Sequence, residues 1–313
     1  MLFFKSFSIR IIGYLPYILF FYVIYTIEIF RELLLNNGLL QLMLFLIVAC
    51  IPAYLTKRMS YVDIAWPWGL VLIGALVLLL GDGYKPRIFL ISGMYLFSGL
   101  RMGIGALILF KKGHLDSELS RYTYQRRRWE KAGYKNLDIS LQYEIMIQCF
   151  ANITFLALPA ILMAQNTATS ISVIEIIGAS LWAIWFVLEH VSDMQKQQFL
   201  KKSFLEKKKK QVCNVGFWKY TRHPNYFSEW MVWNAMIISS ISSFSAAFSQ
   251  DYQLVWIIIC IGLFYISYIM YTTLVYYTGA VPSEFYTLQK RPNYKEYQDQ
   301  TNMFFPGPKK VKS

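Results

Sequence analysis

The sequence is poor in the residue types that build most metal centres and disulfide frameworks. Among its 313 residues there are only three histidines, and no two of them stand four residues apart. A helical zinc site commonly uses such a pair, so metal catalysis is not expected. The four cysteines are widely spaced and form no C-x-x-C pair, which favours free thiols over a disulfide framework.

Two catalytic signatures are also missing, and charged residues are scarce. The absence of G-x-S-x-G and of a P-loop argues against a serine hydrolase and against a nucleotide-driven pump. Only 16% of the residues are charged, whereas 56% are hydrophobic, above the roughly 45–50% of a soluble domain. The basic residues lie between apolar runs rather than on one soluble face, which argues against nucleic acid as a partner. The composition predicts a polytopic membrane protein with membrane lipids around it.

Eight apolar runs approach the roughly 20 residues that a membrane-crossing helix needs. They cover residues 11–30, 38–56, 62–80, 87–110, 141–164, 172–191, 226–248 and 252–277. Of the 31 lysines and arginines, 23 fall in the segments 111–140, 192–225 and 278–313. The positive-inside rule places these segments and both termini in the cytoplasm. The predicted fold is an all-α membrane bundle of about eight transmembrane helices, with cytoplasmic loops and an interfacial C-terminal helix between residues 286 and 304.

The stretch 215–233, VGFWKYTRHPNYFSEWMVW, is the strongest candidate for a functional site. Pro224 favours a helix start at that residue, because proline is well tolerated at the first helical position. Asn225 and Glu229 then share one helix face, one turn inside the membrane segment. The preceding loop is cationic and aromatic, which suits an anionic cofactor held above a lipid-soluble substrate. Interfacial anchoring without chemistry is the alternative for such a loop.

Two further charged features lie within the predicted spans. Glu189 and Asp193 stand four residues apart at the end of the sixth span, where like charges repel unless a ligand or a cation relieves them. Arg101 lies well inside the fourth span and is expected to face the bundle interior. Its partner could be an acid such as Glu28 or Glu189, or a substrate. Small residues around Arg101 favour close helix packing, namely Gly99, Gly103 and Gly105.

Several of these stretches together resemble one known family. The segments EHVSDMQKQQF, GFWKYTRHPNYFSEW, RPNYKEYQ and TNMFFP, with Glu284, are similar to the DUF1295 family, a domain of unknown function related to the C-terminal domain of steroid 5α-reductases. SYVDIAWPWG and RYTYQRRRW extend the resemblance to roughly residues 60–306. The RHPxY element alone is also similar to isoprenylcysteine carboxyl methyltransferases and phospholipid methyltransferases.

The resemblance implies N-terminal transmembrane helices over residues 1–58 and a reductase-like membrane domain over 59–313. It also implies NADPH on the cytoplasmic side and reduction of a carbon–carbon double bond in a lipid or steroid-like enone. Asn225 and Glu229 would orient the nicotinamide carboxamide, and Asp193 would bind ribose or amide donors. Loop cations would neutralise phosphate. The full set of expected cofactor-binding residues is Asp193, Lys219, Arg222, His223, Asn225, Tyr226, Glu229 and Tyr294.

Hydride delivery to an enone builds negative charge on the carbonyl oxygen, so a donor is needed there. The candidates are Arg101, Glu189 and Tyr286. The local sequence SEFYTLQKR lacks the histidine that the steroid reductases have near Tyr286, and this departure weakens the case for a steroid substrate. Two other functions stay open: an S-adenosylmethionine-dependent methyltransferase acting on a lipid or prenyl cysteine, and a non-catalytic lipid-binding membrane protein.

Overall fold

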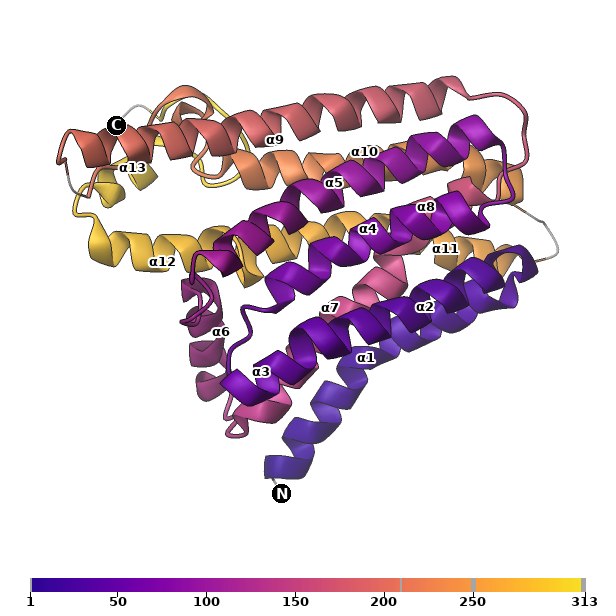
Figure 1. The fold of residues 1–313 in the computed structure, drawn as a ribbon, viewed down its shortest axis with the longest axis horizontal. Helices are drawn as coiled ribbons and strands as arrows, with labels where there is room; N and C mark the ends of the chain where they lie inside the picture. The colour runs from indigo at the N-terminus through magenta and orange to yellow at the C-terminus, as the bar shows by residue number, and fades with distance from the viewer. Residues whose placement is uncertain (1, 209, 249–251, 311–313) are drawn as a thin grey trace. The chain divides into compact units, whose positions relative to one another are not determined.

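A computed structural model describes residues 2–208, 210–248 and 252–310. Every element of regular secondary structure in these ranges is a helix (Figure 1). The all-α prediction is confirmed. The chain forms two compact units: unit 1 is Met1–Ala179 with Met236–Ile266, and unit 2 is Ser180–Ala235 with Ser267–Ser313. The chain passes between the units inside helices α9 (Val173–Leu205), α10 (Pro224–Ala247) and α11 (Gln253–Thr272). The boundary predicted after residue 58 lies within unit 1.

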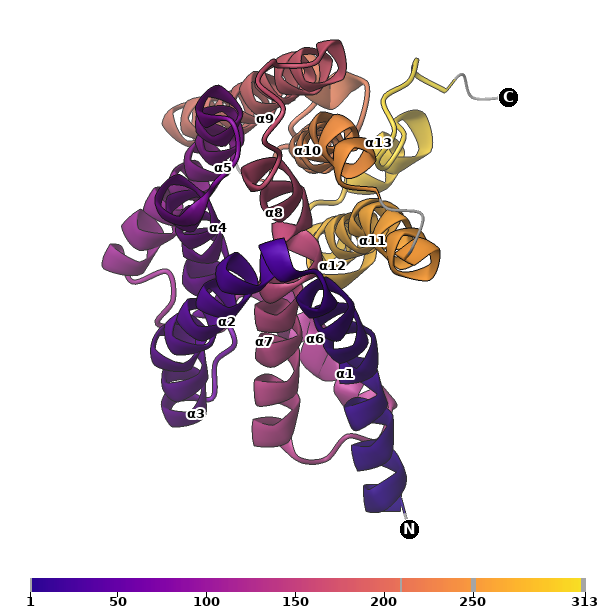
Figure 2. The same cartoon turned by 90° about the vertical axis from the view of Figure 1, so that its right-hand side faces the viewer.

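Unit 1 contains the N-terminal helices of the chain. They are α1 Leu2–Thr26, α2 Arg31–Phe45, α3 Ile51–Thr56, α4 Val62–Leu80, α5 Lys85–Lys111, α6 Ser120–Lys131, α7 Leu137–Ile153 and α8 Leu158–Ala164. Helix α7 packs between α1 and α2 (Figure 2), and α6 runs crosswise to α2, α4 and α5 (Figure 1). A π-helical turn, Leu46–Cys50, joins α2 to α3. A short 3-10 turn, Phe155–Ala157, joins α7 to α8 after the non-helical backbone of Thr154.

Six stretches of the described chain are long and apolar enough to cross a membrane. They are Glu28–Thr56, Val62–Leu80, Lys85–Lys111, Leu137–Ala164, Val173–Leu205 and Gln253–Lys290. Each overlaps one of the predicted spans. The other two predicted spans fall on α1, whose apolar part Arg10–Thr26 is shorter, and on α10, which carries polar serines and asparagines. The membrane-helix prediction is therefore supported, while the number eight is not confirmed.

Close helix packing around Arg101 is confirmed at two of the three glycines. A Cβ atom added at Gly99 would lie 2.7 Å from the carbonyl oxygen of Pro67, and one at Gly103 would lie 2.9 Å from Nε1 of Trp68. Both contacts are with α4, so these glycines let α4 and α5 approach closely. The prediction is wrong for Gly105, where an added Cβ would meet no atom of the described chain within 4 Å.

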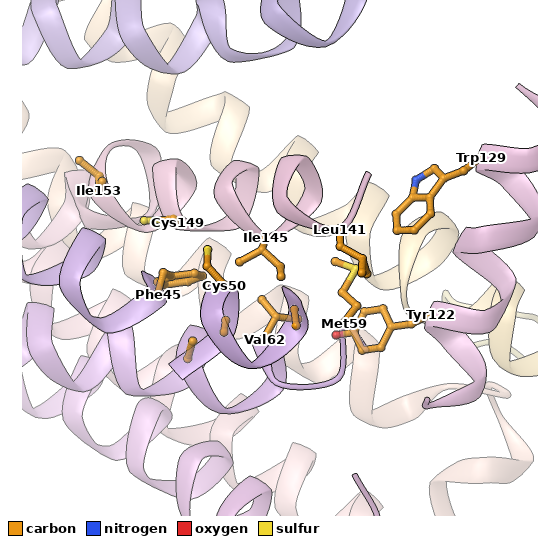
Figure 3. Packing of buried hydrophobic residues seen from close by; sticks show 13 residues of the cluster. Phe45, Cys50, Met59, Val62, Tyr122, Trp129, Leu141, Ile145, Cys149 and Ile153 are labelled. Carbon is orange, nitrogen blue, oxygen red and sulfur yellow. The ribbon is translucent and has the colours of Figure 1, made fainter. Parts of the chain in front are cut away.

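A hydrophobic core joins α2, α3, α4, α6 and α7 within unit 1 (Figure 3). Phe45, Val62 and Ile145 are fully or almost fully buried in it, together with the aromatic rings of Tyr122 and Trp129 from α6. Helix α6 is rich in arginine, yet it buries one aromatic stripe because tyrosine and tryptophan at this spacing face the same side. The core thus fixes a highly basic segment onto the ends of the apolar helices.

Unit 2 contains the second part of α9, the first part of α10, the end of α11 and the C-terminal helices α12 (Ala280–Lys290) and α13 (Tyr294–Gln300). The predicted single C-terminal helix is therefore two helices, separated where Arg291 takes an extended conformation before Pro292. Tyr294, Tyr297 and Phe304 are buried, because they pack inside unit 2. Helix α10 begins at Pro224, as the sequence predicts.

Candidate functional site

The loop before α10 is held against α9 by its backbone and by one tryptophan. Gly216 has a φ of 53°, and a Cβ there would lie 2.3 Å from Oε1 of Gln195. The same Gln195 oxygen accepts the backbone N–H of Phe217 at 2.9 Å. The Trp218 indole donates to the carbonyl of Ser192 at 3.0 Å and lies under the ammonium of Lys196. Glycine is required here because both the left-handed backbone and the close contact exclude a side chain.

The C-terminal segment binds the same loop. Thr221 donates its hydroxyl to backbone carbonyls of Met303 and Phe304, at 3.1 and 2.9 Å, and pairs with Asn302 in an isolated β-bridge. The hydroxyl of Tyr297 donates to the carbonyl of Trp218. These contacts connect residues about 80 positions apart in the sequence, so the loop is shaped by the end of the chain as much as by its own residues.

Arg222, His223 and Glu284 form a buried ionic cluster beside the start of α10. Arg222 donates from Nε and Nη2 to the two carboxylate oxygens of Glu284, at 2.7 and 3.0 Å. His223 Nε2 lies 3.0 Å from Oε1 of Glu284, and the amide of Gln298 donates to Oε2 at 2.6 Å. Arg222 also donates to the carbonyls of Gln298 and Thr301. Because Arg222 and Glu284 are 8% and 6% exposed, this is a two-pronged ion pair shielded from water.

The ionic cluster bears on the prediction that Arg222 binds a phosphate of the cofactor. Nε, Nη1 and Nη2 of Arg222 all donate to acceptors of the protein, so a phosphate at Arg222 would have to displace Glu284 or backbone carbonyls. Lys219, by contrast, is exposed at the end of the 3-10 turn Gly216–Lys219. Of these two cations, Lys219 is the one whose ammonium can reach a phosphate without breaking the buried pair.

Burial lowers the pKa of His223 against the opposing attraction of Glu284, while the nearby cations Lys196 and Arg222 lower it further. The neutral imidazole is thus favoured in the folded chain, whereas an unfolded histidine protonates near pH 6.5. Below that pH the unfolded chain takes up a proton that the folded chain does not, so we expect stability to fall as the pH drops, by at most about 1.4 kcal/mol per pH unit. Melting temperatures between pH 8 and 5.5 measure this loss.

The control for this pH dependence is a matched pair of variants. His223→Gln should flatten the decrease below pH 6.5, whereas His190→Gln, at an exposed position of α9, should leave it unchanged. An equal pH dependence in His223→Gln and in the wild type would show that His223 is not its source.

A second polar pair lies at the first turn of α10. The Asn225 amide donates from Nδ2 to Oδ1 of Asp193 at 3.1 Å, which joins α10 to α9. The other end of the same amide, Oδ1, is inaccessible to solvent and has no hydrogen-bond donor among the described residues. Buried amide oxygens are usually paired, so this atom has an open capacity to accept a hydrogen bond. The sequence placed Asp193 and Asn225 in one site, and the structure brings them together.

The remaining candidates are distributed as follows. Ten of the eleven lie in unit 2, and only Arg101, in α5, belongs to unit 1. His223 stacks flat on Tyr226, with ring centroids 5.3 Å apart and planes inclined by 4°. Tyr294 is buried beside Tyr297, and burial raises its pKa, so its hydroxyl stays protonated. The other positions are Glu189, buried in α9, Glu229, half-buried in α10, and Tyr286, half-buried in α12.

Sequence reasoning gave too little weight to Glu284 and did not consider Gln298. Glu284 is the carboxylate that joins α12 to the loop, and Gln298 donates to it from α13. One signal for Glu284 is present in the sequence. Arg222 and His223 are adjacent and precede an apolar helix, and if these two side chains are buried, the arginine needs a buried acid as its counter-charge. The sequence does not show that they are buried, because loop cations are usually solvated.

Comparisons with known proteins identify one family. The sequence model of the family described as "Protein of unknown function (DUF1295)" matches residues 49–301, which include the loop, the ionic cluster and the Asp193–Asn225 pair. No curated protein and no solved structure matches the chain.

Proposed function

The chain belongs to the DUF1295 family, and from the site that its residues form we propose a membrane-embedded, NADPH-dependent reductase of a carbon–carbon double bond in a lipid or steroid-like enone. The observation that carries the proposal is the Asn225 amide at the start of α10, which donates to Asp193 and whose buried oxygen accepts no hydrogen bond from the described residues. The resemblance to steroid 5α-reductases gives this oxygen a partner: the amide N–H of a nicotinamide carboxamide.

The residues at this position fit a nicotinamide. An unpaired amide oxygen accepts one hydrogen bond, and the carboxamide of the cofactor supplies such a donor. Glu229 follows Asn225 by one helical turn and adds a carboxylate on the same face. Because Nδ2 of Asn225 donates to Asp193, the end of the amide that can bind a ligand is its oxygen. The Asn225 oxygen is thus an acceptor available to the N–H of a carboxamide, and this supports the proposal.

In this proposal NADPH, when bound, supplies the hydride, and the protein binds and orients. Asn225 and Glu229 hold the carboxamide, while Lys219 contributes positive charge for phosphate. Arg222 and Glu284 act indirectly, since their ion pair fixes the loop that leads into α10. His223, Tyr226 and Tyr294 line the cofactor. Within unit 2, the candidate donors to the substrate carbonyl are Glu189 and Tyr286.

We also propose that both termini and the basic segments face the cytoplasm. The support is the concentration of basic residues in three segments of the sequence. Introduced cysteines at positions 123, which is exposed, and 300, in a chain whose Cys213 has been replaced, should react with an impermeant reagent only after the cells are opened. Labelling of intact cells would contradict this orientation.

Loss of the Asn225 amide tests the cofactor directly. We expect Asn225→Ala to weaken NADPH binding by about 1–3 kcal/mol, roughly 5- to 150-fold in Kd, because a buried hydrogen bond to the carboxamide is lost. Isothermal calorimetry on detergent-purified protein measures this. Asn234→Ala is the matched control: it is on the same helix, and its amide is already satisfied by Trp230 and Ser267, at 2.7 and 2.8 Å. It should keep the wild-type NADPH affinity.

The same titration discriminates the other functions. Saturable S-adenosylmethionine binding without any NADPH binding would replace the reductase with a methyltransferase. Binding of neither cofactor would favour a non-catalytic lipid-binding protein. An equal loss of NADPH affinity in Asn225→Ala and Asn234→Ala would show that the effect is not specific to the carboxamide contact.

A further inference from the structure

One tryptophan of unit 2 carries a buried donor without an acceptor. Trp185 lies in α9 with its ring half-buried, and its indole Nε1 is inaccessible to solvent and bonds to no acceptor in the described part of the chain. Two other tryptophans of the unit differ: Trp218 donates to the carbonyl of Ser192, and Trp230 to the carbonyl of Ser267, each at 3.0 Å. Indole N–H groups normally find a partner when buried, so Trp185 of unit 2, like Trp68 of unit 1, departs from the rule among the described residues.

The chemistry of this position narrows the kind of partner. An indole N–H is a donor only, so its partner must be an acceptor such as a carbonyl oxygen. An unpaired donor is especially costly in a membrane-spanning helix, because hydrocarbon offers no water to bond to. Phe227 meets the Trp185 ring edge to face, with centroids 5.4 Å apart, so at least one neighbour of the indole is apolar. The site suits a lipid-soluble molecule with one hydrogen-bond acceptor.

Its place on α9 links Trp185 to the candidate cofactor site. Trp185, Glu189 and Asp193 occupy successive turns of one helix stripe. The rise of about 1.5 Å per residue puts Trp185 about 12 Å along the helix axis from Asp193. Since Asp193 binds Asn225 at the start of α10, Trp185 lies about two turns deeper into the apolar part of α9. A substrate whose reacting carbons lay near the cofactor could extend its carbonyl oxygen toward this donor.

We propose that the Trp185 indole N–H is a further hydrogen-bond donor that binds and orients the carbonyl oxygen of a lipid-soluble ketone in unit 2. Identifying that ketone as an enone substrate rests on the proposed reductase function. The hydrogen bond itself does not, because any carbonyl lipid bound along this face of α9 would use it. Trp185 thus selects for a carbonyl over a hydrocarbon, and its bond strengthens as charge develops on that oxygen.

The test compares Trp185→Phe with Trp218→Phe in the full-length, detergent-purified protein. Both changes remove one indole N–H, but only Trp218 loses a hydrogen bond that exists without ligand, and it also loses its contact with the Lys196 ammonium. We expect Trp185→Phe to melt about 2 °C or more above Trp218→Phe. If Trp185→Phe melts as low as Trp218→Phe, the indole N–H has a partner within the protein and the proposal is overturned.

The ligand arm uses a long-chain unsaturated methyl ketone and the alkene of the same length without the carbonyl. The ketone should raise the melting temperature of the wild type more than the alkene does, and Trp185→Phe should abolish that difference. Ultraviolet resonance Raman of the wild type should show an indole N–H becoming hydrogen-bonded when the ketone is added, a readout that requires no variant. A ketone effect that is absent in the wild type, or unchanged in Trp185→Phe, would overturn the proposal.

The two proposals fail in different ways. If calorimetry finds no NADPH binding while the ketone effect still depends on Trp185, the reductase function is lost and the carbonyl-lipid site stands. If NADPH binds through Asn225 but the ketone effect does not depend on Trp185, the cofactor site stands and the assignment of Trp185 is wrong.

Discussion

Glu284→Gln is expected to destabilise unit 2 by about 3–5 kcal/mol, because it leaves the buried Arg222 guanidinium without its counter-charge. The carboxylate of Glu284 accepts from Arg222, His223 and Gln298, so one substitution weakens the contacts of α12 with both the loop before α10 and α13. Glutamine keeps the size of the side chain, so the loss reports charge and hydrogen bonding rather than a cavity. The denaturant or thermal midpoint of the detergent-purified protein measures it.

Glu296→Gln is the matched control for this change. Glu296 is exposed on α13, where its carboxylate accepts a hydrogen bond from Gln300 at 3.1 Å. Exposed contacts of this kind contribute little, so this variant should stay within about 0.5 kcal/mol of the wild type. Equal midpoints for Glu284→Gln and Glu296→Gln would show that the ionic cluster does not hold unit 2 together.

A double-mutant cycle of Arg222→Met with Glu284→Gln separates the pair from its other contacts. The losses of unfolding free energy in the two single variants should add up to more than the loss in the double variant. In the double variant, neither charge is left buried without its partner. Recovery should be incomplete, since Arg222 also donates to the carbonyls of Gln298 and Thr301, which stay unpaired in the double variant.

The sequence predicts local features of this protein well, because each has a short-range cause. Helix α10 starts at Pro224 because proline fixes a helical φ and lacks only an N–H that would be unpaired at the helix start. The apolar runs coincide with helices because a continuous run of hydrophobic residues has few other stable conformations in a membrane. Asn225 and Asp193 were assigned to one site through a family resemblance, and the contact between them follows from the pairing of α9 with α10.

The pairing of charges could not be predicted in the same way. From the sequence, Arg222 is expected to be a solvated loop cation, because its carboxylate partner, Glu284, is 62 residues away. The same difficulty affects Arg87, which in sequence is a basic residue at the start of the predicted span 87–110. The structure places it in a fully buried ion pair with Glu175, 88 residues further on. Burial of a cation depends on how distant helices pack, and no local pattern reports this.

Arg87→Met is expected to destabilise unit 1 by about 3–5 kcal/mol, for the reason that applies to Glu284. Arg87 and Glu175 are 1% and 0% exposed. The guanidinium also donates to the backbone carbonyls of Asn166, Ala168 and Ser170 in the loop before α9. Methionine keeps much of the side-chain length, but it removes the charge and every donor at once. The free energy of unfolding should fall because the buried Glu175 carboxylate loses its counter-charge and the carbonyls of Ala168 and Ser170 lose their donor, whereas the Asn166 carbonyl keeps the backbone N–H of Tyr84.

The Arg87 substitution should also destabilise the first turns of α9, because Glu175 caps the start of this helix. Glu175 accepts the backbone N–H of Ser172 at 2.6 Å, and Ser172 accepts the N–H of Glu175 at 3.2 Å, which is a reciprocal capping box. Lys85→Met is the control: Lys85 is exposed in the same turn of α5 and donates only to the carbonyl of Gly81, at 3.2 Å. Hydrogen exchange should therefore accelerate in the first turns of α9 in Arg87→Met and not in Lys85→Met. Equal exchange in the two variants would mean that the capping box alone fixes the start of α9 and that the Arg87 pair is not needed for it.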